Sequence, residues 1–142
     1  MKSYEFTVYG EPKPKGRVKF NTKTGVAYSD AKTVQYENLV RMTFVDKFGK
    51  PTPTENPVGI VIRAYFPVPI SWSRKKRQQA LNGEIMMTKR PDIDNIEKAI
   101  YDSLNGLVWS DDKQIVWKYA DKQYAEVPCV TVAIYERSET NE

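Results

Sequence analysis

Four aspartates flank one predicted helix in the stretch KRPDIDNIEKAIYDSLNGLVWSDDKQIV, residues 89–116. Asp92 and Asp94 precede this helix, and in an extended segment residues two apart point in the same direction. Asp111 and Asp112 follow the helix and a short turn. If the chain doubles back along the helix, a third carboxylate joins the first two in an oxygen-only site of the kind that Mg²⁺ prefers. Such sites hydrolyse phosphodiesters, because the metal polarises the phosphoryl oxygen, makes hydroxide available from bound water and stabilises the leaving alkoxide.

Lys98 is a second candidate for this chemistry. It lies four residues after Asp94 and four before Asp102, so the three side chains share one side of the helix. Beside a metal ion, its ammonium could orient the attacking water or offset charge that builds up on the phosphate. The structural alternative is an ordinary surface ion pair, worth roughly 0.2–0.5 kcal/mol.

Each aspartate also has a structural interpretation. In DNIE, Asp94 and Glu97 match the capping box that begins a helix. Asp92 follows a proline and suits a turn, and SDDK suits a surface turn. A calcium-binding EF-hand loop is disfavoured, because Ile96 and Glu97 occupy its fifth and sixth positions, where Asp or Asn and then Gly are needed. Metal ligands and structural acids both remain as interpretations.

Charge is divided unevenly along the chain, whose formal net charge is +4. Residues 1–91 contain 17 Lys and Arg against 7 Asp and Glu, whereas residues 92–142 contain 5 against 11. A basic majority beside an acidic minority suits a protein that grips polyphosphate and also holds divalent cations. Two ordinary solvated surfaces would give the same counts.

Ten basic residues are candidate contacts to DNA phosphates, which position DNA without reading its bases. Solubility or a disordered arm explains the two longer groups equally well. The aromatic residues Trp72, Phe66 and Tyr65 could stack at an opened DNA centre, but core packing is the better interpretation. The ten basic residues are Lys13, Lys15, Arg17, Lys19, Arg74, Lys75, Lys76, Arg77, Lys89 and Arg90.

Composition excludes several classes of chemistry. The chain contains no His, which removes Ser-His-Asp triads and His-ligated zinc. Its single Cys, Cys129, cannot form an intramolecular disulfide, which favours a reducing compartment. The first residues lack the apolar core of a signal peptide, and no run approaches the roughly 18 apolar residues of a membrane span. We therefore expect a soluble, cytoplasmic protein with no membrane partner.

The elements that must position these residues alternate along the chain, without repeats. Strands are predicted from apolar alternation or density at residues 4–10, 58–66, 114–122 and 128–135. Helices are predicted from about 29 to 48, from near Ser71, and after Pro91 up to Asn105-Gly106. A basic loop at 11–24 ends in a short hairpin. The order β-α-β-α-α-β-β predicts one α+β domain over residues 1–142, with helices packed on a small mixed sheet whose last two strands pair as a hairpin.

The stretch RPDIDNIEKAIYDSLNGLVWSDDKQIV resembles the signature of RusA-type Holliday junction resolvases, crossover junction endodeoxyribonucleases often encoded by phages and prophages. The pattern D-x-D-N-x-x-K, a helix and then D-D-x-Q matches at every chemically important position. YGEPKPKGRVKF with the following YSD is similar to the opening of many members, at lower specificity. By position, the metal-binding acids of the family fall on Asp92, Asp94 and Asp112 and its catalytic lysine on Lys98, while Asp111 is a further candidate ligand.

The resemblance implies a RusA-like fold and a homodimer that binds four-way or branched DNA in recombination and repair. It also implies Mg²⁺ as the cofactor, with Mn²⁺ as a substitute, held by the acidic region 92–112 of each chain. The two chains of the dimer would then nick two DNA strands symmetrically. Two other functions stay open at this point. One is a basic DNA-binding module without catalysis, and the other is a nuclease that acts on other branched or single-stranded DNA.

Overall fold

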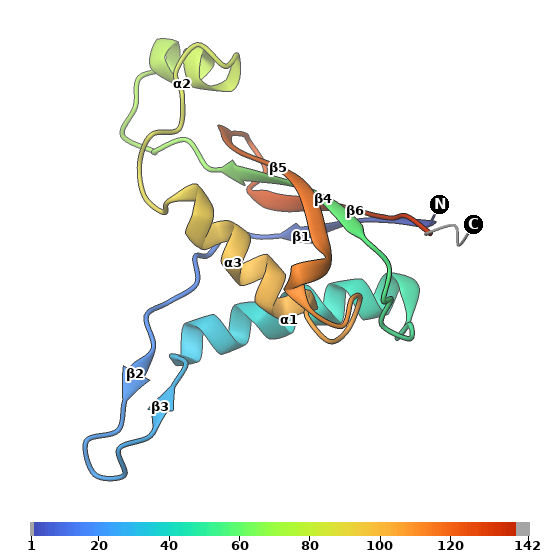
Figure 1. Cartoon of the computed structure of the whole chain (residues 1–142). Helices are drawn as coiled ribbons and strands as arrows, with labels where there is room; N and C mark the ends of the chain where they lie inside the picture. Colours follow the sequence, from blue (N-terminus) through green and yellow to red (C-terminus); the bar gives the residue numbers. More distant parts are fainter. Residues whose placement is uncertain (1, 139–142) are drawn as a thin grey trace.

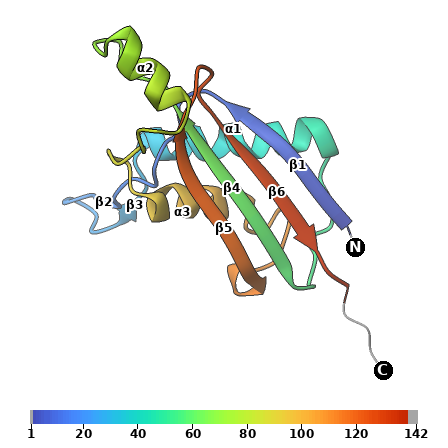
Figure 2. The same cartoon turned by 90° about the horizontal axis from the view of Figure 1, so that it is seen from above.

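The computed structural model describes residues 2–138, in which four strands form one mixed sheet in the order β1-β6-β4-β5. Helices α1 and α3 lie against one face of the sheet, and the other face is open (Figures 1 and 2). The sheet strands are β1 (Lys2–Tyr9), β4 (Val58–Phe66), β5 (Ile115–Tyr124) and β6 (Cys129–Glu136). The helices are α1 (Ala31–Phe48), α2 (Arg74–Leu81) and α3 (Ile93–Leu104). This architecture confirms the predicted α+β class and its mixed sheet.

The last two strands do not form the predicted hairpin. Strand β6 lies between β1 and β4 and is antiparallel to both, whereas β5 pairs with the other side of β4. Strand β6 takes the interior position, where its alternate residues Val130, Val132 and Ile134 are fully buried, whereas the side chains of β5 are mostly exposed or half-buried. The connection between them crosses the end of β4, where the amide of Ala125 donates to the carbonyl of Phe66 at 2.9 Å.

The parallel pairing of β4 and β5 explains the two helices between them. Parallel neighbours cannot be joined by a tight turn and need a crossover connection, usually helical. Here α2 and α3 form that connection. Since α3 is followed closely by β5, the helix and the strand run in opposite directions, with Glu97 beside Lys118 and Pro91 beside Lys122. The start of β5 therefore lies near the end of α3 (Figure 1).

The core lies between the sheet and the two covering helices. In α1, Val40 and Phe44 are fully buried, and Phe44 packs edge-on against the rings of Tyr4 and Phe6 from β1. Leu39 belongs to the predicted apolar pattern but is exposed. The buried side of α1 is formed by Thr33, Tyr36, Val40 and Phe44, and Leu39 lies outside this stripe. The predicted helix after Pro91 is confirmed, and its buried side carries Ile96, Ala99, Ile100, Ser103 and Leu104.

Two basic segments extend beyond the sheet. The loop after β1 carries the small hairpin of β2 (Lys19–Phe20) and β3 (Ala27–Tyr28). This hairpin and α2 extend on opposite sides of the beginning of α3 (Figure 1). Helix α2 begins at Arg74 with Ser73 as its N-cap, later than the predicted start near Ser71. Within residues 2–138, no helix has both the length and the apolar character that crossing a membrane requires.

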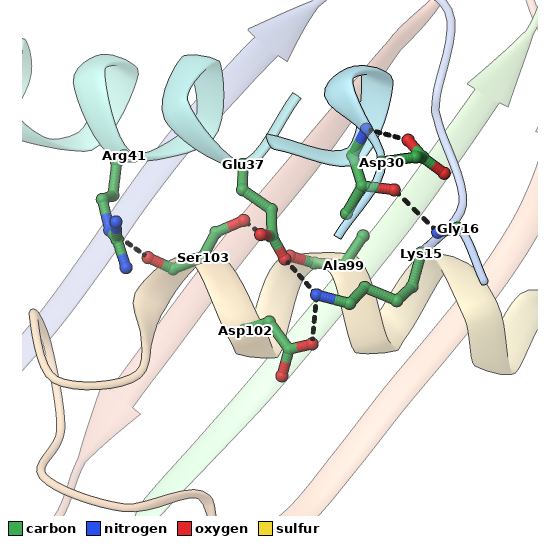
Figure 3. Close-up of polar contacts among 9 residues, drawn as sticks. Lys15, Gly16, Asp30, Glu37, Arg41, Ala99, Asp102 and Ser103 are labelled. Atoms are coloured by element: carbon green, nitrogen blue, oxygen red, sulfur yellow. Dashed lines mark hydrogen bonds and ion pairs between the residues drawn. The ribbon is translucent and has the colours of Figure 1, made fainter. Parts of the chain in front are cut away.

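The basic loop is attached to both covering helices. The Nζ of Lys15 lies 2.9 Å from Glu37 of α1 and 3.0 Å from Asp102 of α3 (Figure 3). Burial acts to lower the pKa of Lys15, but its hydrogen bonds to the two carboxylates raise it overall. A Cβ at the next residue, Gly16, would lie 2.0 Å from a carboxylate oxygen of Asp30, so a larger residue there would displace the side chain that caps α1.

We predict that Lys15→Ala lowers the free energy of unfolding by about 1–2 kcal/mol, because it leaves two partly buried carboxylates without their shared cation. Lys13→Ala is the matched control, since Lys13 is exposed in the same loop, and it should change stability by less than about 0.5 kcal/mol. Urea-induced unfolding followed by circular dichroism measures both. Equal effects of the two substitutions would show that the ion pairs of Lys15 do not hold the loop.

Candidate active site

Two exposed carboxylates stand at the beginning of α3. Asp92 is the N-cap residue by backbone conformation, but its side chain makes no capping hydrogen bond. Asp94 lies in the first turn, where its Oδ1 accepts from the neighbouring amide of Asn95 at 3.1 Å. The partial positive charge of a helix N-terminus favours anions at this position. Both carboxylates are therefore exposed to solvent at the beginning of a helix whose other side is packed in the core.

The predicted capping box in DNIE does not form. The helix begins two residues before the expected position, so Asp94 is not its N-cap. Glu97 is instead buried, at 5% exposure, and pairs with Lys118 of β5 at 3.0 Å. The hydroxyl of Tyr101 donates to the same carboxylate at 3.3 Å. Burial, followed by the nearby charge of Glu97, raises the pKa of Tyr101 well above its usual range.

Asp111 has a structural role at the other end of α3. Its side chain accepts from the amide of Lys113 at 2.9 Å and caps the short 3-10 helix η1 (Asp112–Gln114). The Gln114 side-chain oxygen closes the capping box by accepting from the Asp111 amide at 2.8 Å. The Gln114 amide group then donates to the carbonyls of Thr54 and Asn56, so η1 is tied to the segment before β4.

Asp112 has a different partner from its neighbour. Its Oδ1 accepts a 2.8 Å hydrogen bond from the indole Nε1 of Trp109, a residue that is fully buried. The charge of Asp112 also contributes, after burial and Glu97, to the raised pKa of Tyr101. Within residues 2–138, no hydrogen bond reaches the second oxygen of Asp112. One oxygen is thus fixed and the other stays available.

The two acid pairs lie at opposite ends of α3 within one chain. A helix of 12 residues is about 18 Å long, so Asp112 does not join Asp92 and Asp94 in the way the sequence predicted. The described residues contain no group of three acidic, His or Cys side chains that could hold a metal ion. Asp92 and Asp94 alone still suit Mg²⁺, which is often bound by one or two carboxylates together with waters and substrate phosphates.

Lys98 is exposed on α3, one turn after Asp94. The surface ion pair proposed as its structural alternative is not found within residues 2–138, since Asp102 pairs with Lys15 instead. Among the described residues, the Lys98 ammonium is therefore exposed and has no ion-pair partner. Its position one turn from the acid pair keeps both kinds of charge on the same surface.

The basic residues surround the beginning of α3 from two sides. On one side, the amide of Lys15 donates to the carbonyl of Asn95 at 2.9 Å, which fixes the basic loop beside the acid pair. On the other side, the ammonium groups of Lys76 and Lys89 lie 4.0 and 5.1 Å from the ring centre of Trp72. The exposed candidates for phosphate contacts are Lys13, Arg17, Lys19, Arg74, Lys75, Lys76, Arg77, Lys89 and Arg90. Because Lys15 is already paired, we assign it to holding the loop.

Two of the three aromatic candidates pack in or against the core, as their structural interpretation predicts. Phe66 is buried in the core at the end of β4, and Trp72 packs edge-on against Tyr124. Tyr65 is half-buried on the neighbouring side of β4. Exposed aromatic side chains lie elsewhere, on Tyr9, Phe20 and Tyr28 and on Trp117 and Tyr119 of β5.

Several residues that support the site were not predicted from the sequence. Lys122 donates to the carbonyls of Lys89 and Pro91 at 2.7 and 3.0 Å, which holds the segment that leads into Asp92. Trp109 and Gln114 fix the opposite acid pair. The spacing of Trp109, three residues before Asp112, and the match of Asp111 with Gln114 to a capping box are signals that the sequence contained.

Comparison with known proteins identifies one family and one similar protein. The sequence model described as "Endodeoxyribonuclease RusA" matches residues 9–135. The chain is also 34% identical over 142 residues to a protein of Bacillus subtilis strain 168 named "Uncharacterized protein YqaN", covering 97% of this chain and 99% of that protein. The matched region contains all four aspartates and Lys98, together with both basic segments.

We predict that Asp111→Ala destabilises the protein by about 1 kcal/mol, because it removes the acceptor that caps η1. Asp111→Asn should cost less, since its side-chain oxygen can still accept from Lys113. Asp46→Ala, an exposed change on α1, is the control and should stay within about 0.5 kcal/mol of the unmodified protein. Urea unfolding measures all three, and an unchanged stability of Asp111→Ala would contradict the capping role.

Proposed function

The chain belongs to the RusA family of endodeoxyribonucleases, and we propose that it resolves four-way DNA junctions by paired, Mg²⁺-dependent nicks. Family membership supports nuclease action on Holliday junction DNA in general. The observation that carries the finer proposal is the pair of exposed carboxylates at the N-terminus of α3, with Lys98 one turn away and without an ion-pair partner in the described part of the chain. Basic residues lie on both sides of this pair, as a site that must bring phosphates to a cation requires.

Each of these side chains has a separate proposed task. Asp92 and Asp94 would hold the metal ion, which when bound polarises the scissile phosphate and lowers the pKa of a water molecule. Lys98 would contact the phosphate and offset the negative charge that develops on its oxygens. The exposed basic residues of the loop and of α2 would hold the flanking DNA backbone.

We further propose a homodimer in which Asp112 of the partner subunit completes each site. Within one chain, α3 separates Asp112 from Asp92 and Asp94. A two-fold axis near the middle of α3 would reverse the partner's helix, so the end of one helix would lie beside the beginning of the other. A contact along β5, next to α3, would also cover exposed apolar side chains, namely Val116 at 65%, Trp117 at 48% and Tyr119 at 49% exposure.

We predict that the protein nicks a synthetic four-way junction in the presence of Mg²⁺, and that neither EDTA-treated protein with the junction nor matched linear duplex with Mg²⁺ gives product. Asp92→Asn and Asp94→Asn should still bind the junction in gel-shift assays, because losing a negative charge near phosphate reduces repulsion while it removes cation affinity. Lys98→Ala should lose cleavage far more than binding. Denaturing gels resolve the nicked strands.

The same assay separates the alternative functions. Binding without cleavage under any metal condition would leave a basic DNA-binding module. Cleavage of flaps or single strands in preference to junctions would keep the chemistry and change the substrate. Cutting by Asp92→Asn and Asp94→Asn at the unmodified rate would remove these acids from the mechanism.

A second prediction concerns the shared site. Asp92→Asn and Asp112→Asn chains are co-expressed with different tags and purified as a heterodimer. If Asp112 acts on the partner's acid pair, both substitutions fall in one site and the other site stays complete. We expect this heterodimer to nick one strand of a junction, while each homodimeric variant nicks none.

The control is a heterodimer of Asp92→Asn and Asp94→Asn chains, which damages both sites in any arrangement and should be inactive. An inactive Asp92→Asn with Asp112→Asn heterodimer, alongside an active unmodified protein, would show that each chain supplies all its own acids. Size-exclusion chromatography with light scattering verifies that each preparation is dimeric.

A further inference from the structure

The indole of Trp109 is a polar side chain enclosed in the core next to the candidate site. Its residue has 0% exposure and belongs to the hydrophobic core. The surrounding backbone is also fixed, since the amide of Ser110 donates to Thr54 at 3.2 Å and the carbonyl of Trp109 accepts from Gly106 at 2.7 Å. The ring therefore has little freedom to move.

The indole has one polar hydrogen, and the fold directs it at a carboxylate. Nε1 is a donor with no acceptor function, so its 2.8 Å bond to Oδ1 defines where that oxygen lies. Hydrogen bonds to an ionised acceptor are stronger than those between neutral groups. Asp112 also begins η1, which Gln114 anchors to Thr54 and Asn56. Both the backbone and one oxygen of Asp112 are thus held.

We propose that Trp109 is a positioning residue for the metal ligand Asp112, fixing Oδ1 through its indole N–H so that Oδ2 is presented to the cation. This inference rests on the proposed function, in which Asp112 binds a divalent ion. Groups that hold a ligand from behind commonly change metal affinity by 10–100-fold when they are removed. Trp109 does not touch the ion or the DNA in this proposal, and it acts only through Asp112.

A purely structural reading of the same bond is possible, and it makes a different prediction. A buried indole N–H needs an acceptor, and Asp112 could be there to supply one. In that case, loss of the N–H would alter the stability of the fold and leave metal affinity unchanged. Metal binding measured without DNA separates the two, because it reports on the ligand and involves no turnover.

The test is the substitution Trp109→Phe, which keeps a buried aromatic ring and removes the N–H. Free Mn²⁺ is titrated by EPR in solutions of the full-length protein without DNA. We expect the Kd for Mn²⁺ to rise 10–100-fold, and the Mg²⁺ concentration for half-maximal junction cleavage to rise in parallel. Junction affinity in EDTA should stay unchanged, because the DNA contacts lie elsewhere.

Tyr36→Phe is the matched control, since it removes one polar atom from another buried aromatic residue, on α1, and should leave the Kd for Mn²⁺ unchanged. A Trp109→Phe protein whose Kd for Mn²⁺ stays within about twofold of the unmodified value would overturn the proposal. Asp112→Asn distinguishes this failure from a failure of the proposed function. If Asp112→Asn also binds Mn²⁺ normally, Asp112 is not a ligand and the proposed site itself is wrong.

A second variant covers the case in which the smaller ring of Phe prevents folding. Benzothienylalanine, introduced at position 109 by nonsense suppression, keeps the size of the indole and replaces its N–H by sulfur. Thermal unfolding verifies that this protein is folded before the Mn²⁺ titration. The same 10–100-fold loss of Mn²⁺ affinity is expected, and an unchanged affinity in this folded variant would overturn the proposal.

Discussion

Burial of one face of α3 is the constraint on which the candidate site depends. Ile96, Ile100 and Leu104 are enclosed between the sheet and α1, so the helix has a fixed position and direction. Asp92 is its N-cap residue, Asp94 lies in its first turn, and Asp112 begins η1 after its end. The core therefore sets where charge lies at both ends of the helix. Bonds from the loops, such as those of Lys15 and Lys122, then adjust the surroundings of each end.

The separation of the acids is also favourable for the single chain. Three carboxylates close together without a cation repel one another, and that repulsion would oppose folding. At opposite ends of α3, each pair instead has local compensation, from the helix N-terminus for Asp94 and from the Trp109 indole for Asp112. In a dimer of the proposed kind, the acids would converge only when the subunits associate, where a cation and DNA can offset the charge.

The sequence predicted those features that depend on local pattern. Strand β4 was predicted at residues 58–66 because its apolar run is dense and bounded by prolines, and α1 and α3 were predicted from helical spacing and breakers. Features that depend on distant partners were not predictable in this way. The order of β5 and β6 depends on which strand buries more of its surface. The N-cap of α3 is Asp92 and not Asp94. Glu97 pairs with Lys118, which lies 21 residues away in the sequence. Likewise, the pattern could not show that Lys15 is occupied by Glu37.

The adjacent residues Asp111 and Asp112 have different hydrogen-bond partners. Consecutive residues at the start of η1 point in different directions, so one carboxylate turns back to the backbone and the other meets Trp109. In D-D-x-Q, the first Asp and the Gln close a capping box, and the Gln side chain joins that box to the segment before β4. The spacing of D-D-x-Q is therefore the spacing that this capping box requires. Within residues 2–138, each carboxylate has one oxygen in a hydrogen bond, Asp111 with the Lys113 amide and Asp112 with the Trp109 indole. The two acids therefore differ in their partner, because a backbone amide of η1 holds Asp111 and a buried side chain holds Asp112.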